Sequence, residues 1–155
     1  MSTKPKIKIK DYSEIRSKID NEYEHTNQVV LAKWAILCAN HVSQFLKGEN
    51  LDYTEIEKGF KINELWQNGK ATVHEVRQAG FRIHAIARQC KTELAKNAVR
   101  TAGQAVGVGH MREHAMVCSD YAIKTIELAF PDDFSKIEEE RVWQLNELRN
   151  LKASP

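Results

Sequence analysis

The string His110-Met111-Arg112-Glu113-His114 has the residue types and spacing that metal chemistry requires. It matches H-x-x-E-H, the inverted zincin pattern. On a helix, His110 and His114 would lie one turn apart and could share a zinc ion, while Glu113 polarised a zinc-bound water. The signal is weak, because only three positions are fixed and zinc proteases of this kind are much longer than this chain. We therefore do not expect a zinc protease.

Four histidines nevertheless fall on or beside apolar helix faces. At 100° per residue, His114 lies about 40° from His110, within the apolar arc of a helix predicted over 110–130. His41 lies in the apolar arc of a helix predicted over 27–47, and His84 lies beside the apolar stripe of another. The pattern predicts that all four approach one interior.

Two interpretations of these histidines stay open. The first is a buried, hydrogen-bonded network, in which Tyr121 or Arg100 supplies partners and burial lowers the histidine pKa values. The second is a metal or catalytic cluster inside a helical bundle. Its candidate ligands are His41, His84, His110 and His114. Di-iron bundles use Glu-x-x-His on two helices, and only residues 22–25 resemble that here, so we expect no metal and no cofactor.

Composition describes one ordinary globular domain. The chain has 155 residues, of which 42% are hydrophobic and 28% are charged. Its net charge of +2 gives no global drive toward nucleic acid or an anionic membrane. No apolar run approaches the roughly 20 residues that cross a bilayer, and no signal peptide is visible. Cys38, Cys90 and Cys118 suit a reducing compartment, so we expect a cytoplasmic protein.

The elements that must position the histidines are helices. Positions 6–130 contain no proline, and apolar residues recur at helical spacing along most of the chain. Helices are predicted over 13–23, 27–47, 54–67, from 72 onward, 93–106, 110–130 and 135–151. The expected fold is all-α, a compact bundle of about five to seven helices forming a single domain over 13–152. Residues 1–12, with four lysines, are expected to be a flexible basic arm.

Capping boxes are predicted at three helix starts, and each pairs a short polar residue with a glutamate three positions later. The pairs are Asp11 with Glu14, Thr72 with Glu75, and Ser135 with Glu138.

Small residues form a seam along the helix predicted over 93–106. The positions are Ala95, Ala98, Ala102, Ala105 and Gly109. Such a seam lets another helix approach closely. One alternative for the whole protein is therefore a structural or regulatory homodimer that pairs through this seam.

Several segments together resemble a known family. They are Ala32-Lys33-Trp34-Ala35, Trp66-Gln67-Asn68-Gly69-Lys70, Glu75-Val76-Arg77-Gln78-Ala79, Val99-Arg100-Thr101-Ala102-Gly103-Gln104-Ala105-Val106, His110, His114-Ala115 and Tyr121-Ala122. This chain resembles the bacterial immunity-five-like proteins of polymorphic toxin systems over about 31–128. Two departures stand out: Gln104 replaces a histidine that the family often has, and Glu113 lies outside the family pattern.

The resemblance implies a non-enzymatic cytoplasmic protein that binds and blocks a cognate toxin. It also implies a buried polar cluster, structural or functional, made of Arg77, His84, Arg100, His110, His114 and Tyr121. A histidine-based or metal-dependent enzyme and a helical dimer remain the alternatives.

Overall fold

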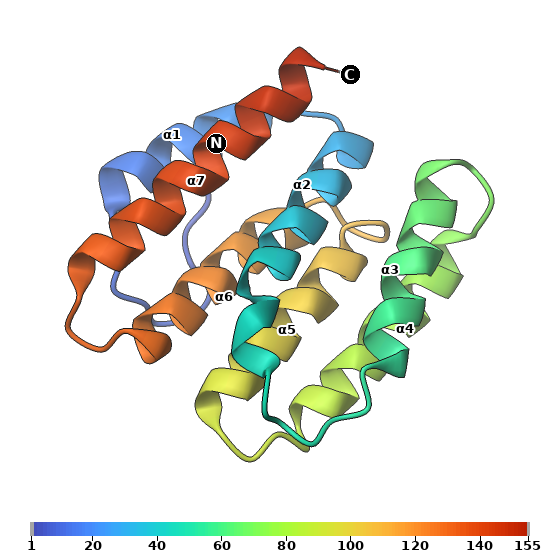
Figure 1. Cartoon of the computed structure of the whole chain (residues 1–155). Coiled ribbons are helices and arrows are strands. Elements are labelled where there is room, and N and C mark those ends of the chain that lie inside the picture. The colour runs from blue at the N-terminus through green and yellow to red at the C-terminus, as the bar shows by residue number, and fades with distance from the viewer. Residues whose placement is uncertain (1, 155) are drawn as a thin grey trace.

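The computed structural model describes residues 2–154, which form seven α-helices and one short 3-10 helix (Figure 1). The helices are α1 (Ser13–Glu24), α2 (Gln28–Val42), η1 (Ser43–Leu46), α3 (Thr54–Gln67), α4 (Val73–Ala87), α5 (Glu93–Gly107), α6 (His114–Ala129) and α7 (Phe134–Ala153). The predicted all-α bundle is confirmed.

Helix α5 lies at the centre of the packing. It contacts α4 on one flank and α6 on the other, so these three helices form a layer. Helix α2 packs across α5 and α6, and α3 packs across α4 and α5 (Figure 1). Helices α1 and α7 pack against each other beside α6 and α2. One side of the α4–α5–α6 layer is thus covered by α2 and α3.

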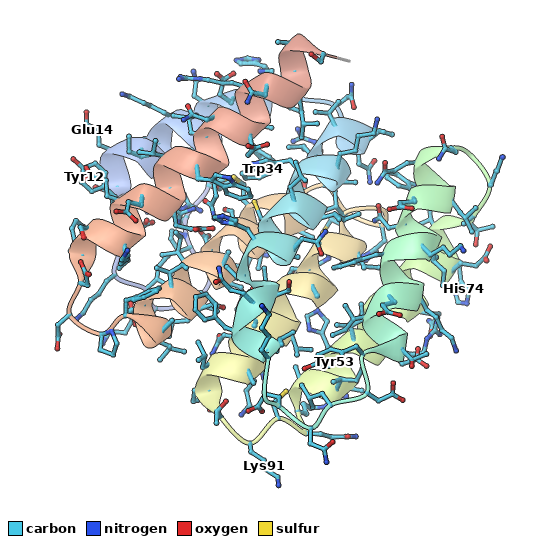
Figure 2. All side chains as sticks on the ribbon, in the orientation of Figure 1. Tyr12, Glu14, Trp34, Tyr53, His74 and Lys91 are labelled. Carbon is cyan, nitrogen blue, oxygen red and sulfur yellow. The ribbon has the colours of Figure 1, made fainter. Side chains whose placement is uncertain are left out.

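The core is built around α2, whose side chains are the most apolar of the bundle. Trp34, Leu31 and Cys38 are fully buried. Figure 2 shows Trp34 inside the molecule, between α2 and α7. Its indole Nε1 donates a 2.8 Å hydrogen bond to the backbone carbonyl of Gln144 on α7. This bond satisfies the one polar atom of the indole, so the ring can be buried without an unpaired donor.

The segment Gln28–Leu46 is, by length and hydropathy alone, apolar enough to cross a membrane. The expectation that no apolar run approaches that length is therefore wrong. In the structure this segment is α2 followed by η1, and α2 packs against α5, α6 and α7. A helix that packs against other helices on several sides needs apolar residues on each of those sides, and this accounts for the hydropathy of the segment.

The small-residue seam of α5 faces the inside of the same chain. Ala95, Ala98 and Ala105 are at most 2% exposed. At the end of the seam, a Cβ added to Gly109 would lie 2.6 Å from the Val76 side chain. The expectation that this seam is free to pair two copies of the chain is wrong, because neighbouring helices of the bundle already occupy it.

One of the three predicted capping boxes is confirmed. The backbone N–H of Glu75 donates to Thr72 Oγ1, and the backbone N–H of Thr72 donates to the Glu75 carboxylate. At the start of α7, Ser135 instead donates to Asp133 through its hydroxyl, and no side chain caps the helix.

The capping box predicted at Asp11 is wrong, because that carboxylate is engaged elsewhere. It accepts hydrogen bonds of 2.8 and 2.9 Å from the guanidinium of Arg141, 130 positions away on α7. Arg141 also binds Asp120 at 2.7 Å, and Asp120 binds Arg16 at 2.9 Å. These four charged groups join α1, α6 and α7 in one buried network.

The basic arm predicted over 1–12 contacts the bundle at both of its ends, although Met1 lies outside the described residues. Near its start, the backbone N–H and the hydroxyl of Thr3 both donate to the Asp20 carboxylate on α1. Near its end, the backbone N–H of Lys10 donates to Glu127 on α6. The lysine side chains at positions 4, 6, 8 and 10 are exposed.

Candidate functional site

Two glycines on α5 bring two histidine rings against the helix backbone. A Cβ added to Gly103 would lie 2.6–2.9 Å from three atoms of the His84 imidazole. One turn later, a Cβ added to Gly107 would lie 3.1–3.5 Å from three atoms of the His114 imidazole. Glycine is required here for close approach, since any side chain at position 103 would overlap the His84 ring.

The same glycines let α4 approach α5 closely. A Cβ built on Gly80 would lie 3.5 Å from the Gly103 carbonyl oxygen, so backbone nearly meets backbone at this crossing. This contact fixes the height of α4 along α5, and it places His84, one turn after Gly80, over Gly103.

His114 is oriented by an amide. Its Nδ1 lies 2.6 Å from Oε1 of Gln104 on α5. Because an amide oxygen only accepts hydrogen bonds, the imidazole donates from Nδ1 and keeps Nε2 as its acceptor. The ring of His110 lies beside it, with the two ring centroids 5.0 Å apart. Gln104 is therefore a direct partner of the histidine cluster.

His84 and His114 are held in the neutral form. The pKa of His114 is lowered to about 4, mainly by burial and also by the nearby His110, His84 and Lys6, while Glu113 acts in the opposite direction. Burial also lowers the pKa of His84, and the charges of Arg100 and Arg88 act in the same direction. Both imidazoles are uncharged at neutral pH, which is what burial among cations dictates.

The structure brings together three of the four predicted histidines. The rings of His110 and His114 are adjacent, and the rings of His84 and His114 lie against Gly103 and Gly107, which are one turn apart on α5. His41 lies elsewhere: its Nδ1 is 2.7 Å from Glu140, and its ring stacks on Trp143 of α7 at 3.7 Å. The expectation that all four approach one interior is wrong for His41. This residue lies on the side of α2 that packs against α7, away from the other three histidines.

His110 reaches the cluster by a route that the helical pattern did not predict. Helix α6 begins at His114, and His110 lies in the turn between α5 and α6. Backbone hydrogen bonds from His110 and Met111 to the Gly107 carbonyl form that turn. The H-x-x-E-H string is therefore not one continuous helix, and the helical wheel drawn through His110 was wrong.

The remaining residues of the predicted cluster lie on three different helices. Arg100 is half-buried on α5 beside His84, and Tyr121 is half-buried on α6. Arg77 is exposed on α4, where its guanidinium carbon lies 5.2 Å from the ring centroid of Phe81. Arg77 is thus not a buried residue, because it lies on the outward side of α4.

The chemistry available at other reactive side chains is limited by burial. Cys38 and Cys118 are fully buried, and burial raises the pKa of each thiol well above its ordinary value. Both thiols therefore stay protonated, and a protonated thiol is a poor nucleophile. Among residues 2–154, no group of three His, Cys, Asp or Glu side chains is arranged to hold a metal ion.

Replacing Gly103 by alanine is expected to displace His84 into solvent. The added methyl would occupy the space of the imidazole, which can swing outward at a cost below about 1 kcal/mol in stability, because alanine also favours the helix. The pKa of His84 should then rise toward its ordinary value of 6.5, as measured by NMR titration.

The matched control is Gly80→Ala, which adds the same methyl in ordinary van der Waals contact with α5. It should leave the His84 titration unchanged. Equal titration curves for the wild type and Gly103→Ala would contradict the placement of the ring.

Acidification is expected to destabilise the protein through His114. Its folded pKa is about 4 against an ordinary 6.5, so below pH 6.5 the unfolded chain takes up a proton before the folded chain does. The contribution to the free energy of unfolding is complete above pH 6.5 and is lost as the pH falls toward 4. Urea titrations across this range should show a shallower loss in His114→Gln than in the wild type. Equal slopes, or a His114 resonance that titrates near pH 6.5, would contradict this assignment.

Comparison with known proteins supports the resemblance noted in the sequence. Residues 21–151 match a family model described as "Imm-5 like putative immunity protein". No curated protein and no solved structure shows significant similarity to the chain. The matched region runs from within α1 to within α7, so it includes the histidine cluster and the core around it. The chain therefore belongs to the Imm-5 like family of immunity proteins.

Proposed function

We propose that this protein binds a cognate bacterial toxin and neutralises it by occlusion, without catalysing a reaction. The observation that carries the proposal is the family match over residues 21–151. We further propose that it acts in the bacterial cytoplasm, as part of a polymorphic toxin system. Occlusion of this kind needs an interface of about 800 Å² on each partner.

The geometry of the histidine cluster supports a binding role over a catalytic one. A general base works best with a pKa near the operating pH, whereas the pKa of His114 is about 4. The neutral amide of Gln104 orients this ring, and a neutral amide stabilises an imidazolium far less than a carboxylate would. These rings pack as uncharged polar surfaces against the glycines of α5.

A growth assay tests the proposal. The polypeptide encoded by the gene beside this one is expressed from an inducible promoter in a heterologous bacterium, with and without this protein. We expect growth arrest that co-expression relieves, and a one-to-one complex of the two purified proteins by titration calorimetry. Arrest that persists at full co-expression, or relief without complex formation, would refute neutralisation by binding.

A further inference from the structure

We infer that the toxin docks on the outward side of the α4–α5–α6 layer, and that it meets this side with an acidic surface. This inference rests on the proposed function and names the binding site and the chemistry of the partner. We call this side the basic face and define it by Arg77, Phe81, His84, Arg88, Arg100 and His114.

The basic face lies opposite the covered side of the layer. Ala98 and Ala102 of α5 line a cavity of about 540 Å³ together with residues of α2, η1 and α3. Arg100 and Gln104 each follow one of these alanines by two positions, which is a rotation of about 200° around the helix. Both side chains are half-buried and project from α5 on the side that faces away from α2 and α3.

The three arginines of the basic face lack the carboxylate partners that the arginines of α1 and α7 have. Three arginines of α1 and α7 form ion pairs: Arg16 with Asp120, Arg141 with Asp11 and Asp120, and Arg149 with Glu22. Within residues 2–154, the side chains of Arg77, Arg88 and Arg100 form no ion pair and no hydrogen bond. Three free guanidinium groups on one face provide donors for carboxylates of a partner.

Permanently charged side chains lie near both neutral imidazoles of the basic face. Arg88 and Arg100 both act on His84, and Lys6 of the basic arm acts on His114. Glu113 is the acidic group that faces His114. These cations act in the same direction as burial on the pKa of the two imidazoles, and they would repel a basic partner and attract an acidic one.

An exposed aromatic ring gives the basic face an apolar anchor. Phe81 is 49% exposed, and the Arg77 guanidinium lies over its ring. Aromatic and arginine side chains are the types most enriched at the energetic centres of interfaces. A stacked guanidinium keeps its N–H groups free in the plane, so Arg77 and Phe81 together offer donors and apolar area to the partner.

Charge reversal provides the main test, with the polypeptide of the neighbouring gene as the probe. The double variant Arg77→Glu/Arg100→Glu is compared with Lys18→Glu/Lys33→Glu, which changes the net charge equally at exposed positions on α1 and α2. We expect the first to weaken the complex about 100-fold or more and to abolish growth rescue, and the second to change the Kd less than about threefold. Equal Kd values for the two double variants would overturn the inference.

Two further variants keep this test informative if Arg100→Glu disturbs folding. Arg77→Glu and Phe81→Ala alter exposed side chains only, and both should melt at the wild-type temperature. Each is expected to weaken the complex about tenfold or more. Wild-type affinity in both variants would overturn the inference.

A second measurement does not depend on the neighbouring gene. Poly-L-glutamate is added to the isotope-labelled protein at low salt, and NMR shifts are followed. We expect the largest shifts at Arg77–Arg88 and at residues 100–114. Shifts confined to the arm or to α1 and α7 would overturn the inference, and so would tighter binding of a double-stranded DNA of equal charge. An absence of toxicity or of rescue by the wild type would refute the proposed function, whereas these NMR results test the basic face separately.

Discussion

Replacing Arg141 by alanine is expected to lower the free energy of unfolding by about 3–5 kcal/mol, the largest effect of any single charge in this protein. The side chain of Arg141 is fully buried, and it binds the carboxylates of Asp11 and Asp120 as well as the side chain of Gln144. Its removal leaves buried carboxylates with fewer donors in a low-dielectric interior, where an unpaired charge is costly.

Thermal melting followed by circular dichroism checks this effect. A change of this size should lower the Tm by about 6–20 °C for a domain of this length. Arg149→Ala is the matched control, because it removes the same side chain from the same helix at an exposed ion pair with Glu22. That control should cost less than about 1 kcal/mol. Similar melting temperatures for the two variants would show that the buried network contributes little.

Replacing Trp34 by alanine is expected to cost about 3–5 kcal/mol. The indole is fully buried at the centre of α2, and it is the largest completely buried side chain of the protein. Its removal opens a cavity between α2 and α7 and deletes the hydrogen bond to the Gln144 carbonyl. The bundle can relax around such a cavity only in part, because its helices are fixed by many other contacts.

Urea unfolding, monitored by circular dichroism, measures the cost of Trp34→Ala. The control is Trp66→Ala, since Trp66 is only partly buried at the end of α3 and should cost less. Trp34→Phe should fall between the wild type and Trp34→Ala, because it keeps most of the ring volume. A cost below about 1 kcal/mol for Trp34→Ala would contradict the central position of this residue in the core.

The helices were predictable because their signals are local. The absence of proline over 6–130 and the 3.6-residue apolar period together locate all seven helices, and the Thr72–Glu75 pair marks the start of α4. At the two predicted capping boxes that do not form, the capping side chain binds another side chain instead of the helix backbone. Asp11 binds an arginine 130 positions away, and no pattern within a few residues can report such a partner.

The histidine cluster was predictable only in part, because its geometry is tertiary. The wheel of α6 places His114 inward, but the packing of Gly80 on Gly103 decides that His84 meets the same surface. Glycine lowers the helix propensity of positions 103 and 107, yet at each of them its missing side chain makes room for an imidazole. His41 lies on an apolar helix face as the other histidines do, and its contact with Glu140 depends on where α7 packs in the folded protein.

The sequence also could not predict which arginines remain without an ion-pair partner on the basic face. The chain carries 23 basic and 21 acidic residues, a balance that suggests no preference for any partner. The fold separates these charges, because α1 and α7 pair their arginines with carboxylates while the outward sides of α4 and α5 leave theirs unpaired. A near-neutral chain thereby carries three unpaired arginines on the basic face.

Amide hydrogen exchange of the complex tests the central claim most directly. The protein is exchanged alone and together with the polypeptide of the neighbouring gene, and protection is compared helix by helix. We predict added protection at Arg77–Arg88 on α4 and at 100–114, with α1 and α7 unchanged. Added protection confined to α1, α7 or the basic arm would contradict docking on the basic face.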